Sequence, residues 1–132
     1  MTLVTSGKRK SATARVVIRE GKGIVRINHR LLETIQPEMI RMKIKEPLIM
    51  AGAISTKVDI DVKVNGGGTV SQADAIRLAI AKALLGFSKD PTLEETFNQY
   101  DRHLLVADVR RKEDRKPNTN SKARAKKQKS YR

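Results

Sequence analysis

The side chains best suited by type to acid–base catalysis or metal binding are two histidines. His29 and His103 are its only imidazoles, and they lie far apart in the sequence, outside any HExxH-type pair. We interpret both as surface or hydrogen-bonding residues. The chain has no cysteine, which excludes disulfides, thiolate metal sites and a cysteine nucleophile.

Two aspartates, Asp59 and Asp61, could bind a metal from one face of a strand. They alternate with apolar residues, as on any solvated strand face, and Lys57 and Lys63 flank them. This pattern favours a salt-bridged face over a metal site. No nucleophile, base and oxyanion donor can be combined, so we expect no enzyme and no cofactor or metal.

A run of three glycines, Gly66-Gly67-Gly68, precedes a predicted helix. Such a run can bind phosphate, because glycines let backbone N–H groups approach an anion at the positive end of a helix. It lacks the Gly-Lys-Ser/Thr ending of nucleotide triphosphate loops and the G-x-G-x-x-G spacing of dinucleotide sites. Two compatible interpretations stay open: a tight strand-to-helix turn, and a docking point for an RNA backbone phosphate.

Cations gather near the N-terminus just before a predicted strand. The stretch Gly7–Arg15 holds four of them, with two hydroxyl residues: Lys8, Arg9, Lys10, Ser11, Thr13 and Arg15. The alternative is a frayed, charged lead-in. We favour a phosphate-binding edge, in which the cations supply charge and the hydroxyls donate hydrogen bonds.

The largest excess of charge lies at the C-terminus. The formal net charge is +14 over 132 residues, which points to a polyanionic partner. The segment 109–132 has only two carboxylates against eleven cations, namely Arg110, Arg111, Lys112, Arg115, Lys116, Lys122, Arg124, Lys126, Lys127, Lys129 and Arg132. Its few apolar groups cannot offset an ordering cost of about 1–2 kcal/mol per residue, so we expect a tail that is disordered when free.

The tail has two less specific interpretations, a solubilising terminus and a nuclear localisation signal. Interleaved polar groups, which can contact phosphate, sugar and base edges, favour RNA binding instead. Aromatic residues make up only 3% of the chain. We therefore expect recognition through phosphates and shape, with Tyr131 as the one aromatic free to stack.

The elements that must position these residues begin with a clear strand. Lys57–Val64 alternates charged and apolar residues, which predicts a half-buried strand with its valines and isoleucine facing a core. Ala12–Ile18 and Ile24–Ile27 flank a segment with two glycines and predict a hairpin. Pro37–Met50 predicts one short helix, whose later part Pro47 disrupts.

The second half of the chain is predicted to be mostly helical. Thr69 and Gln72 suggest a capping box at the start of a helix that Gly86 ends. A second helix is expected at Thr92–Tyr100, followed by a short strand at Leu104–Val106. The mixture predicts a two-layer α/β (α+β) domain over residues 1–108, with a mixed sheet and helices packed on one face.

The length and the termini suggest one intracellular domain. No apolar stretch approaches the roughly 20 residues of a membrane span, and Met1–Lys10 lacks the apolar region of an export signal. We expect no membrane partner.

Four ordered motifs together resemble the universal small-subunit ribosomal protein nine family, over about Gly7 to the last residue. They are Gly7–Val16; Ile24–Asn28; the three glycines with Gln72 and Ala75-Ile76-Arg77; and a C-terminal set of Asp108, Arg110, Glu113, Lys122–Arg124 and Gln128–Arg132. The final Gln-Lys-Ser-Tyr-Arg is similar to archaeal and eukaryotic members. Pro117–Asn120 departs from the family pattern and leaves the local path of the tail open.

The resemblance implies a structural, cytoplasmic protein of the small-subunit head, with a fold like domain two of the ribosomal S-five family. Its implied partners are small-subunit ribosomal RNA, neighbouring head proteins and the transfer RNA of the peptidyl site, with no DNA. The implied ribosomal RNA contacts are Lys8, Arg9, Lys10, Ser11, Arg15, Gly66, Gly67, Gly68, Gln72, Arg77, Arg110, Arg111, Lys116, Lys122, Arg124, Lys126 and Lys127. The implied contacts to the transfer RNA anticodon stem-loop are Gln128, Lys129, Ser130, Tyr131 and Arg132.

Two functions from other classes stay as alternatives. An RNA-processing enzyme or its protein subunit could use a similar basic α/β domain, because the fold alone does not decide function. A DNA-coating protein is disfavoured, since no dimerising heptad or recognition-helix pattern is visible.

Overall fold

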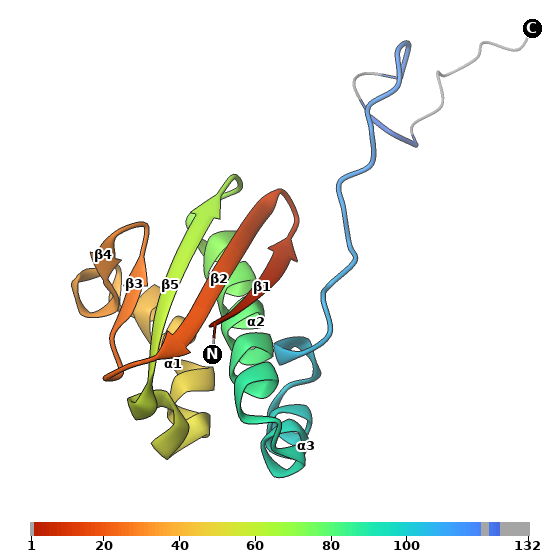
Figure 1. Ribbon diagram of the computed structural model, residues 1–132. Coiled ribbons are helices and arrows are strands. Elements are labelled where there is room, and N and C mark those ends of the chain that lie inside the picture. Colours follow the sequence, from red (N-terminus) through yellow and green to blue (C-terminus); the bar gives the residue numbers. More distant parts are fainter. Residues whose placement is uncertain (1, 120–121, 125–132) are drawn as a thin grey trace, which may run out of the picture.

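The described chain, residues 2–119 and 122–124 of the computed structural model, forms a sheet covered by helices (Figure 1). The strands are β1 (Thr2–Arg9), β2 (Ala12–Glu20), β3 (Val25–Ile27), β4 (Arg30–Leu31) and β5 (Val58–Asn65). The α-helices are α1 (Glu38–Ala51), α2 (Thr69–Ser88) and α3 (Pro91–Tyr100). Three 3-10 turns lie between them: η1 (Leu32–Thr34), η2 (Gly52–Lys57) and η3 (Arg102–Leu104).

The sheet has the order β1-β2-β5-β3-β4 and is mixed, because β3 runs parallel to β5 whereas the other neighbours are antiparallel. The predicted hairpin of β2 and β3 is therefore wrong. After Glu20 the chain bends around the start of β5, where Asp59 Oδ1 accepts the backbone N–H groups of Lys22 (2.9 Å) and Ile24 (3.0 Å). With these bonds the chain crosses β5, so that β3 pairs with the edge of β5 opposite to β2.

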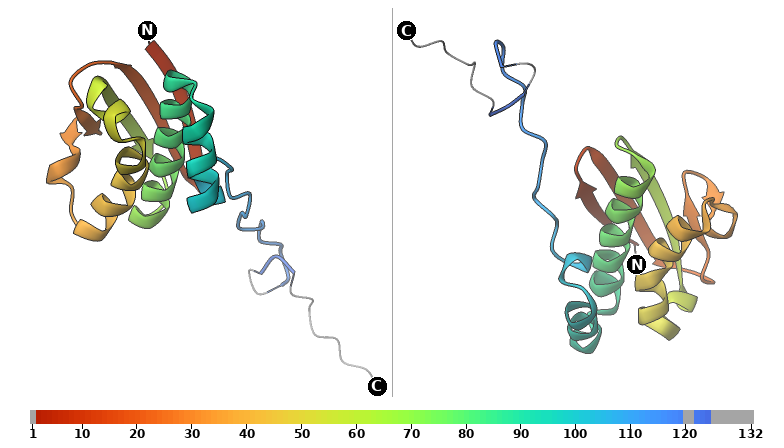
Figure 2. Two further views of the ribbon diagram at one scale, coloured as in Figure 1. Left: turned by 90° about the horizontal axis from the view of Figure 1, so that it is seen from below. Right: turned by 180° about the vertical axis from the view of Figure 1, so that it is seen from behind.

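Helices cover one face of the sheet and leave the other open (Figure 2). The inward side chains of β2 and β5 are buried against α2, whose small and branched residues form the facing layer. The wholly buried residues of the resulting core include Val16, Ile18, Val58, Ile60, Ala75, Ala79, Ile80, Ala83 and Leu84, together with Phe97 of α3. The predicted two-layer fold is confirmed, as is the inward face of the Lys57–Val64 strand.

The basic lead-in that precedes Ala12 is itself an edge strand, β1. It pairs with β2 along its whole length, from Thr2 opposite Arg19 to Arg9 opposite Ala12. Gly7 permits α2 to lie close, because a Cβ there would be 2.3 Å from the carbonyl oxygen of Ala75. A frayed lead-in is therefore wrong for this segment.

Two predicted helix ends are wrong for packing reasons. Helix α1 continues through Pro47, whose ring is buried, so packing offsets the hydrogen bond that a proline cannot donate. Helix α2 passes Gly86 and ends with Lys89 in the left-handed region. Gly86 serves contact with β1, since a Cβ there would lie 2.5 Å from the Leu3 side chain.

Three other local predictions, a helix cap, a short strand and the single free aromatic, are also wrong. Gly68, not Thr69, is the N-cap of α2, and no side chain caps it. The predicted strand at Leu104–Val106 is replaced by η3, where the Asp101 carboxylate accepts the N–H of His103 (2.9 Å). Tyr100 on α3 is 59% exposed, so Tyr131 is not the one aromatic available for stacking. No helix in the described ranges is long and apolar enough to cross a bilayer.

Candidate nucleic-acid interface

A cationic cleft of about 780 Å³ lies between the β1–β2 turn and the chain that follows Asp108. No carboxylate of the described residues lines it. Its lining is six cations and two hydroxyl residues, namely Lys8, Arg9, Lys10, Ser11, Thr13, Arg110, Arg111 and Lys112. The structure thus joins the two basic segments that the sequence separates by about a hundred residues. Thr13 belonged to the predicted phosphate-binding edge, whereas Lys112 was not among the predicted contacts, although it lies within the predicted basic tail.

The turn between β1 and β2 displays the first of these basic segments. Only Lys10 and Ser11 connect the two strands, and Lys10 adopts the left-handed region (φ 51°). The strand pairing on either side fixes Lys8 opposite Thr13 and Arg9 opposite Ala12. Since side chains alternate along β1, Lys8 is exposed while Arg9 turns inward and is only half-buried.

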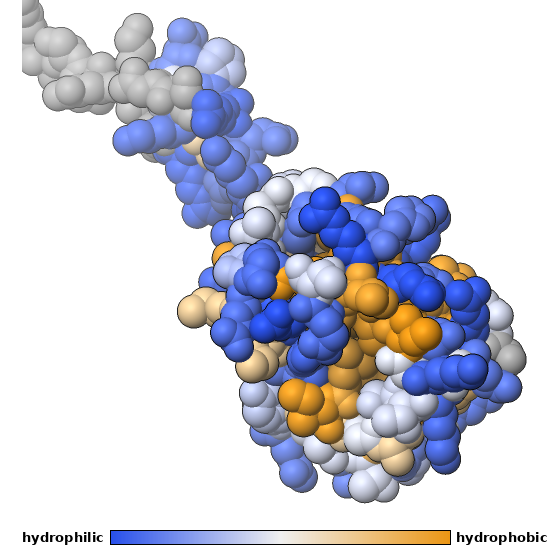
Figure 3. All heavy atoms as spheres, turned by 90° about the vertical axis from the view of Figure 1, so that its left-hand side faces the viewer, coloured by the Kyte–Doolittle hydropathy of each residue, from blue (hydrophilic) through white to orange (hydrophobic). Residues whose placement is uncertain are grey.

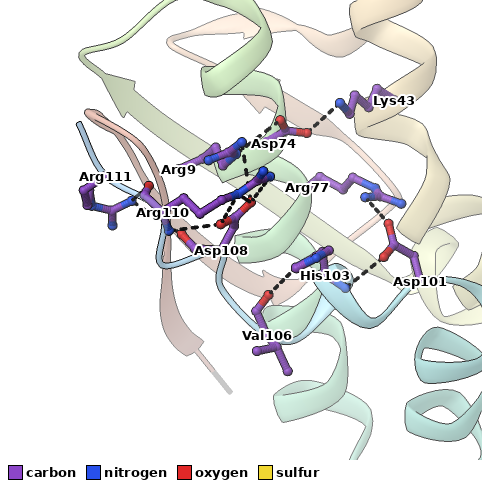
Figure 4. Close-up of polar contacts among 10 residues, drawn as sticks. All are labelled: Arg9, Lys43, Asp74, Arg77, Asp101, His103, Val106, Asp108, Arg110 and Arg111. Atoms are coloured by element: carbon purple, nitrogen blue, oxygen red, sulfur yellow. Dashed lines mark hydrogen bonds and ion pairs between the residues drawn. The ribbon is translucent and has the colours of Figure 1, made fainter. Parts of the chain in front are cut away.

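Asp108 holds the second basic segment against β1 (Figure 4). Its carboxylate accepts three hydrogen bonds from the Arg110 guanidinium, two from Nε at 3.0 Å and one from Nη2 at 2.7 Å, and one from the Arg110 backbone N–H. Arg9 approaches the same carboxylate at 3.5 Å. These hydrogen bonds, with the positive charge of Arg110 and Arg9, hold the pKa of Asp108 well below its usual range.

Arg9 and its neighbour Arg77 are neutralised inside the domain (Figure 4). Asp74 lies 3.9 Å from Arg9 and also pairs with Lys43 at 2.6 Å. Arg77 is 8% exposed and contacts Glu46 (2.5 Å) and Asp101 (2.9 Å).

Asp101 illustrates the balance at this internal cluster. Burial raises its pKa, but the hydrogen bonds from the His103 N–H and the Arg77 guanidinium outweigh it, so the pKa is lowered overall. The structure does not bring Arg77 to the cleft. Lys8, Lys10, Arg111 and Lys112 have no carboxylate partner within the described part of the chain.

The glycine run forms a tight turn beside the β1–β2 turn. Gly66 and Gly67 have φ of 76° and 67°, a region that favours glycine. A Cβ on Gly66 would be 2.5 Å from the Ser11 carbonyl oxygen. Gln72 closes the turn by donating from its side-chain amide to the Gly66 carbonyl (3.0 Å), in place of the predicted capping box.

The open face of the sheet bears Arg15 and the two aspartates. The salt-bridged face is present, but its cations are arginines of other strands: Arg19 (3.0 Å) and Arg26 (3.6 Å) pair with Asp61. The lysines that flank the aspartates do not pair with them. Within residues 2–119 and 122–124, no group of three or more histidine, aspartate or glutamate side chains is arranged to hold a metal.

Some predicted tail contacts can be located and others cannot. From Ala107 to Thr119 the chain forms no helix or strand and leads away from the domain (Figure 1). Lys116 and Lys122 belong to a turn closed by Thr119, while Arg124 pairs with Glu113. Lys126, Lys127 and the predicted transfer RNA contacts at 128–132 lie outside the described residues.

An apolar groove of about 540 Å³ lies at the opposite edge of the sheet, between β4 and α1. Leu31 and Ile49 are exposed there, and hydrophobic residues gather on this side of the molecule (Figure 3). A groove of this kind does not suit RNA phosphates.

Comparison with known proteins gives one consistent family. The family model described as ribosomal protein S9/S16 matches residues 7–132. The small ribosomal subunit protein uS9 of Methanococcus vannielii is 52% identical over 129 residues, which cover 97% of this chain and 96% of that protein. The uS9 proteins of two Methanococcus maripaludis strains are 50% identical with the same coverage.

Proposed function

Because the chain belongs to the ribosomal protein S9/S16 family, we propose that it binds small-subunit ribosomal RNA through its cationic cleft. The family is structural and its relatives are named as small-subunit ribosomal proteins, so the chain is a constituent of the ribosome and not an enzyme. This sets aside the RNA-processing alternative. Its place of action is the ribosome of the cytoplasm.

The cleft is the observation that supports RNA as its ligand. Four of its six cations have no carboxylate partner in the described chain, and Ser11 and Thr13 add hydroxyl groups. Cations without partners attract phosphate and release condensed counterions when it binds, which makes the affinity strongly salt-dependent. No aromatic side chain lines the cleft, so the proposed contacts are mainly to phosphate and sugar.

Residues 1–108 form the RNA-binding domain in this proposal, and residues 109–132 form a basic tail that becomes ordered on RNA. Asp108 stands at this boundary and holds the start of the tail against β1. The tail cations Lys116, Lys122, Arg124, Lys126 and Lys127 then neutralise further phosphates. The terminal residues 128–132 contact the anticodon stem-loop of the peptidyl-site transfer RNA. Arginine suits the last position because its planar fork binds phosphate oxygens in two places.

Neighbouring proteins of the subunit head complete the proposed set of partners. The apolar groove between β4 and α1 is the described surface best suited to a protein, since Leu31 and Ile49 are exposed there and two of its three charged residues, Glu33 and Lys45, pair with each other. It lies away from the cleft, so both partners can bind together.

Sedimentation tests the ribosomal assignment first. After a high-salt wash, the protein should co-migrate with small-subunit RNA at close to one copy per subunit. Release into the light fractions would contradict a structural role and would favour a transient RNA factor.

Truncation tests the tail separately. Subunits that lack Gln128–Arg132 should assemble but retain peptidyl-site transfer RNA less well, and Arg132→Ala should have a smaller effect because one phosphate contact is lost among several. Equal retention by truncated and full-length subunits would refute the tail role, while leaving the cleft proposal intact.

A further inference from the structure

The open face of the sheet carries two cations that no internal interaction explains. The register of β2 and β5 places Arg15 directly opposite Lys63, and both side chains are exposed. Neither makes an ion pair with any described residue. Like charges directly opposite on one sheet face destabilise the pair, so this arrangement costs stability that the fold itself does not recover.

At the other end of the same face, the charges of Asp59 and Asp61 are satisfied within the protein. Asp61, two residues before Lys63, pairs with Arg19 and Arg26, and Asp59 accepts two backbone N–H groups. Every carboxylate of β5 is therefore occupied by other partners. Arg15 and Lys63 remain as a positive half of the face beside a neutralised half.

The positive half is continuous with the cleft. Thr13, which lines the cleft, is two residues from Arg15 on the same face of β2 and lies opposite Lys8 of β1. Asn65 follows Lys63 on β5 and lies opposite Thr13. The side chains that extend from the cleft onto the sheet are thus Lys8, Thr13, Asn65, Arg15 and Lys63, and none is acidic.

We propose that the RNA bound in the cleft continues over the open face of the sheet, where Arg15 and Lys63 bind its phosphates. The inference rests on the proposed function and adds to it a second phosphate-binding surface and a path. It commits to the RNA backbone as ligand, because the five side chains offer cations, a hydroxyl and an amide but no aromatic ring for base stacking.

Charge removal with a matched control tests the proposal. The full-length protein is titrated onto a protein-free small-subunit ribosomal RNA transcript at several salt concentrations, with Arg15→Gln, Lys63→Gln and the double variant. Lys57→Gln is the control, because Lys57 is exposed at the end of η2, directly before the neutralised end of β5. Each lost phosphate contact should lower the salt slope by about 0.7, so the double variant should bind about 20-fold more weakly at about 0.1 M salt.

Thermal unfolding of the same variants separates binding from folding. Removal of one of two opposed like charges should leave the Tm unchanged or raise it, so the affinity should fall while stability does not. A salt slope equal to that of the parent protein, or a loss as large in Lys57→Gln, would overturn the proposal.

A single cysteine reports which macromolecule covers the face. The natural chain has none, so Lys63→Cys can carry either an iron chelate that cleaves nearby RNA or a photo-crosslinker in assembled subunits. Strong RNA cleavage from position 63 and weak cleavage from Lys57→Cys is expected. A crosslink to a neighbouring protein without RNA cleavage would refute the sheet-face site, whereas loss of RNA binding only in cleft variants would leave the proposed function standing.

Discussion

The domain contains two groups of cations that differ in their carboxylate partners, one around Arg77 and one in the cationic cleft. Arg77 is 8% exposed and lies between Glu46 and Asp101. The cleft has six cations, of which Arg9 and Arg110 pair with Asp108 and the other four have no carboxylate partner in the described chain. The first cluster is complete within the protein, and the second is complete only with a partner.

The difference teaches that carboxylate partners, rather than residue type, separate cations that serve the fold from those that serve binding. A buried charge without its partner is expensive, so the Arg77 cluster must be satisfied for the chain to fold. An exposed cation is hydrated and costs little in the free protein, so it can be left for a ligand. Substitutions in the cleft should therefore lower RNA affinity and leave stability unchanged, whereas substitutions in the Arg77 cluster should lower stability and leave RNA affinity unchanged.

The largest effect is expected from the cleft. In Lys10→Gln/Arg111→Gln/Lys112→Gln, three phosphate contacts are lost, and affinity for small-subunit ribosomal RNA should fall about 100-fold at about 0.1 M salt, with a salt slope lower by about 2. The free energy of unfolding should change by less than about 0.5 kcal/mol. Filter binding and urea unfolding measure the two quantities. A comparable loss of stability would place these cations with Arg77.

The next effect is expected from the internal cluster. Arg77→Met leaves Glu46 and Asp101 without their shared cation, and since both carboxylates are about one-third exposed, the cost should be about 2 kcal/mol rather than that of a fully buried pair. Urea unfolding should show the loss, while the salt slope for RNA stays unchanged. Arg102→Met, at an exposed neighbouring position, is the control. A reduced salt slope in Arg77→Met would show that Arg77 contacts RNA directly.

The sequence predicted elements whose signal is local. The alternation in Lys57–Val64 identified β5 and its buried face, and the helix expected to begin near Thr69 is α2. The end of α2 was not predictable, since Gly86 is present to admit Leu3 from β1. The place of β3 was equally hidden, because side-chain bonds of Asp59 to the backbone, made 35 and 37 residues apart, direct that strand.

The site was predictable in composition but not in arrangement. The sequence indicated Lys8, Lys10 and Arg111 as candidate RNA contacts, but only tertiary structure brings the tail beside the β1–β2 turn. Arg77 is indistinguishable in sequence from an exposed arginine, as its partners come from α1 and from the residue before η3. Lys63 was assigned to salt bridges with Asp59 and Asp61, whereas cross-strand arginines and backbone N–H groups occupy both.

Substitutions in the glycine turn should have smaller effects on stability and RNA affinity. They distinguish a purely structural turn from a docking point for an RNA phosphate. Gly67→Ala forces a side chain into the left-handed region and places Cβ 3.0 Å from Ala12, which should cost about 1–2 kcal/mol of unfolding free energy. Gly68→Ser is the control, because its position is open and serine is a good N-cap. If stability holds in Gly68→Ser while RNA affinity falls, a phosphate docks at this helix terminus; if neither changes, the run serves only the turn.

The smallest effect is expected at Asp108, which neutralises Arg9 and Arg110 at the edge of the cleft. A carboxyl whose pKa is lowered on folding contributes stability above its unfolded value, ordinarily about 3.8, and loses it as the pH falls toward the folded value. Asp108→Asn should therefore lower the Tm slightly at neutral pH, and the gap to the parent protein should close below about pH 3.8. RNA affinity at neutral pH should stay equal or rise, because a negative charge beside the cleft is removed. If RNA affinity instead falls as much as in the cleft variant, Asp108 acts by orienting Arg110 and Arg111 toward the RNA. This one carboxylate would then serve both the fold and RNA binding.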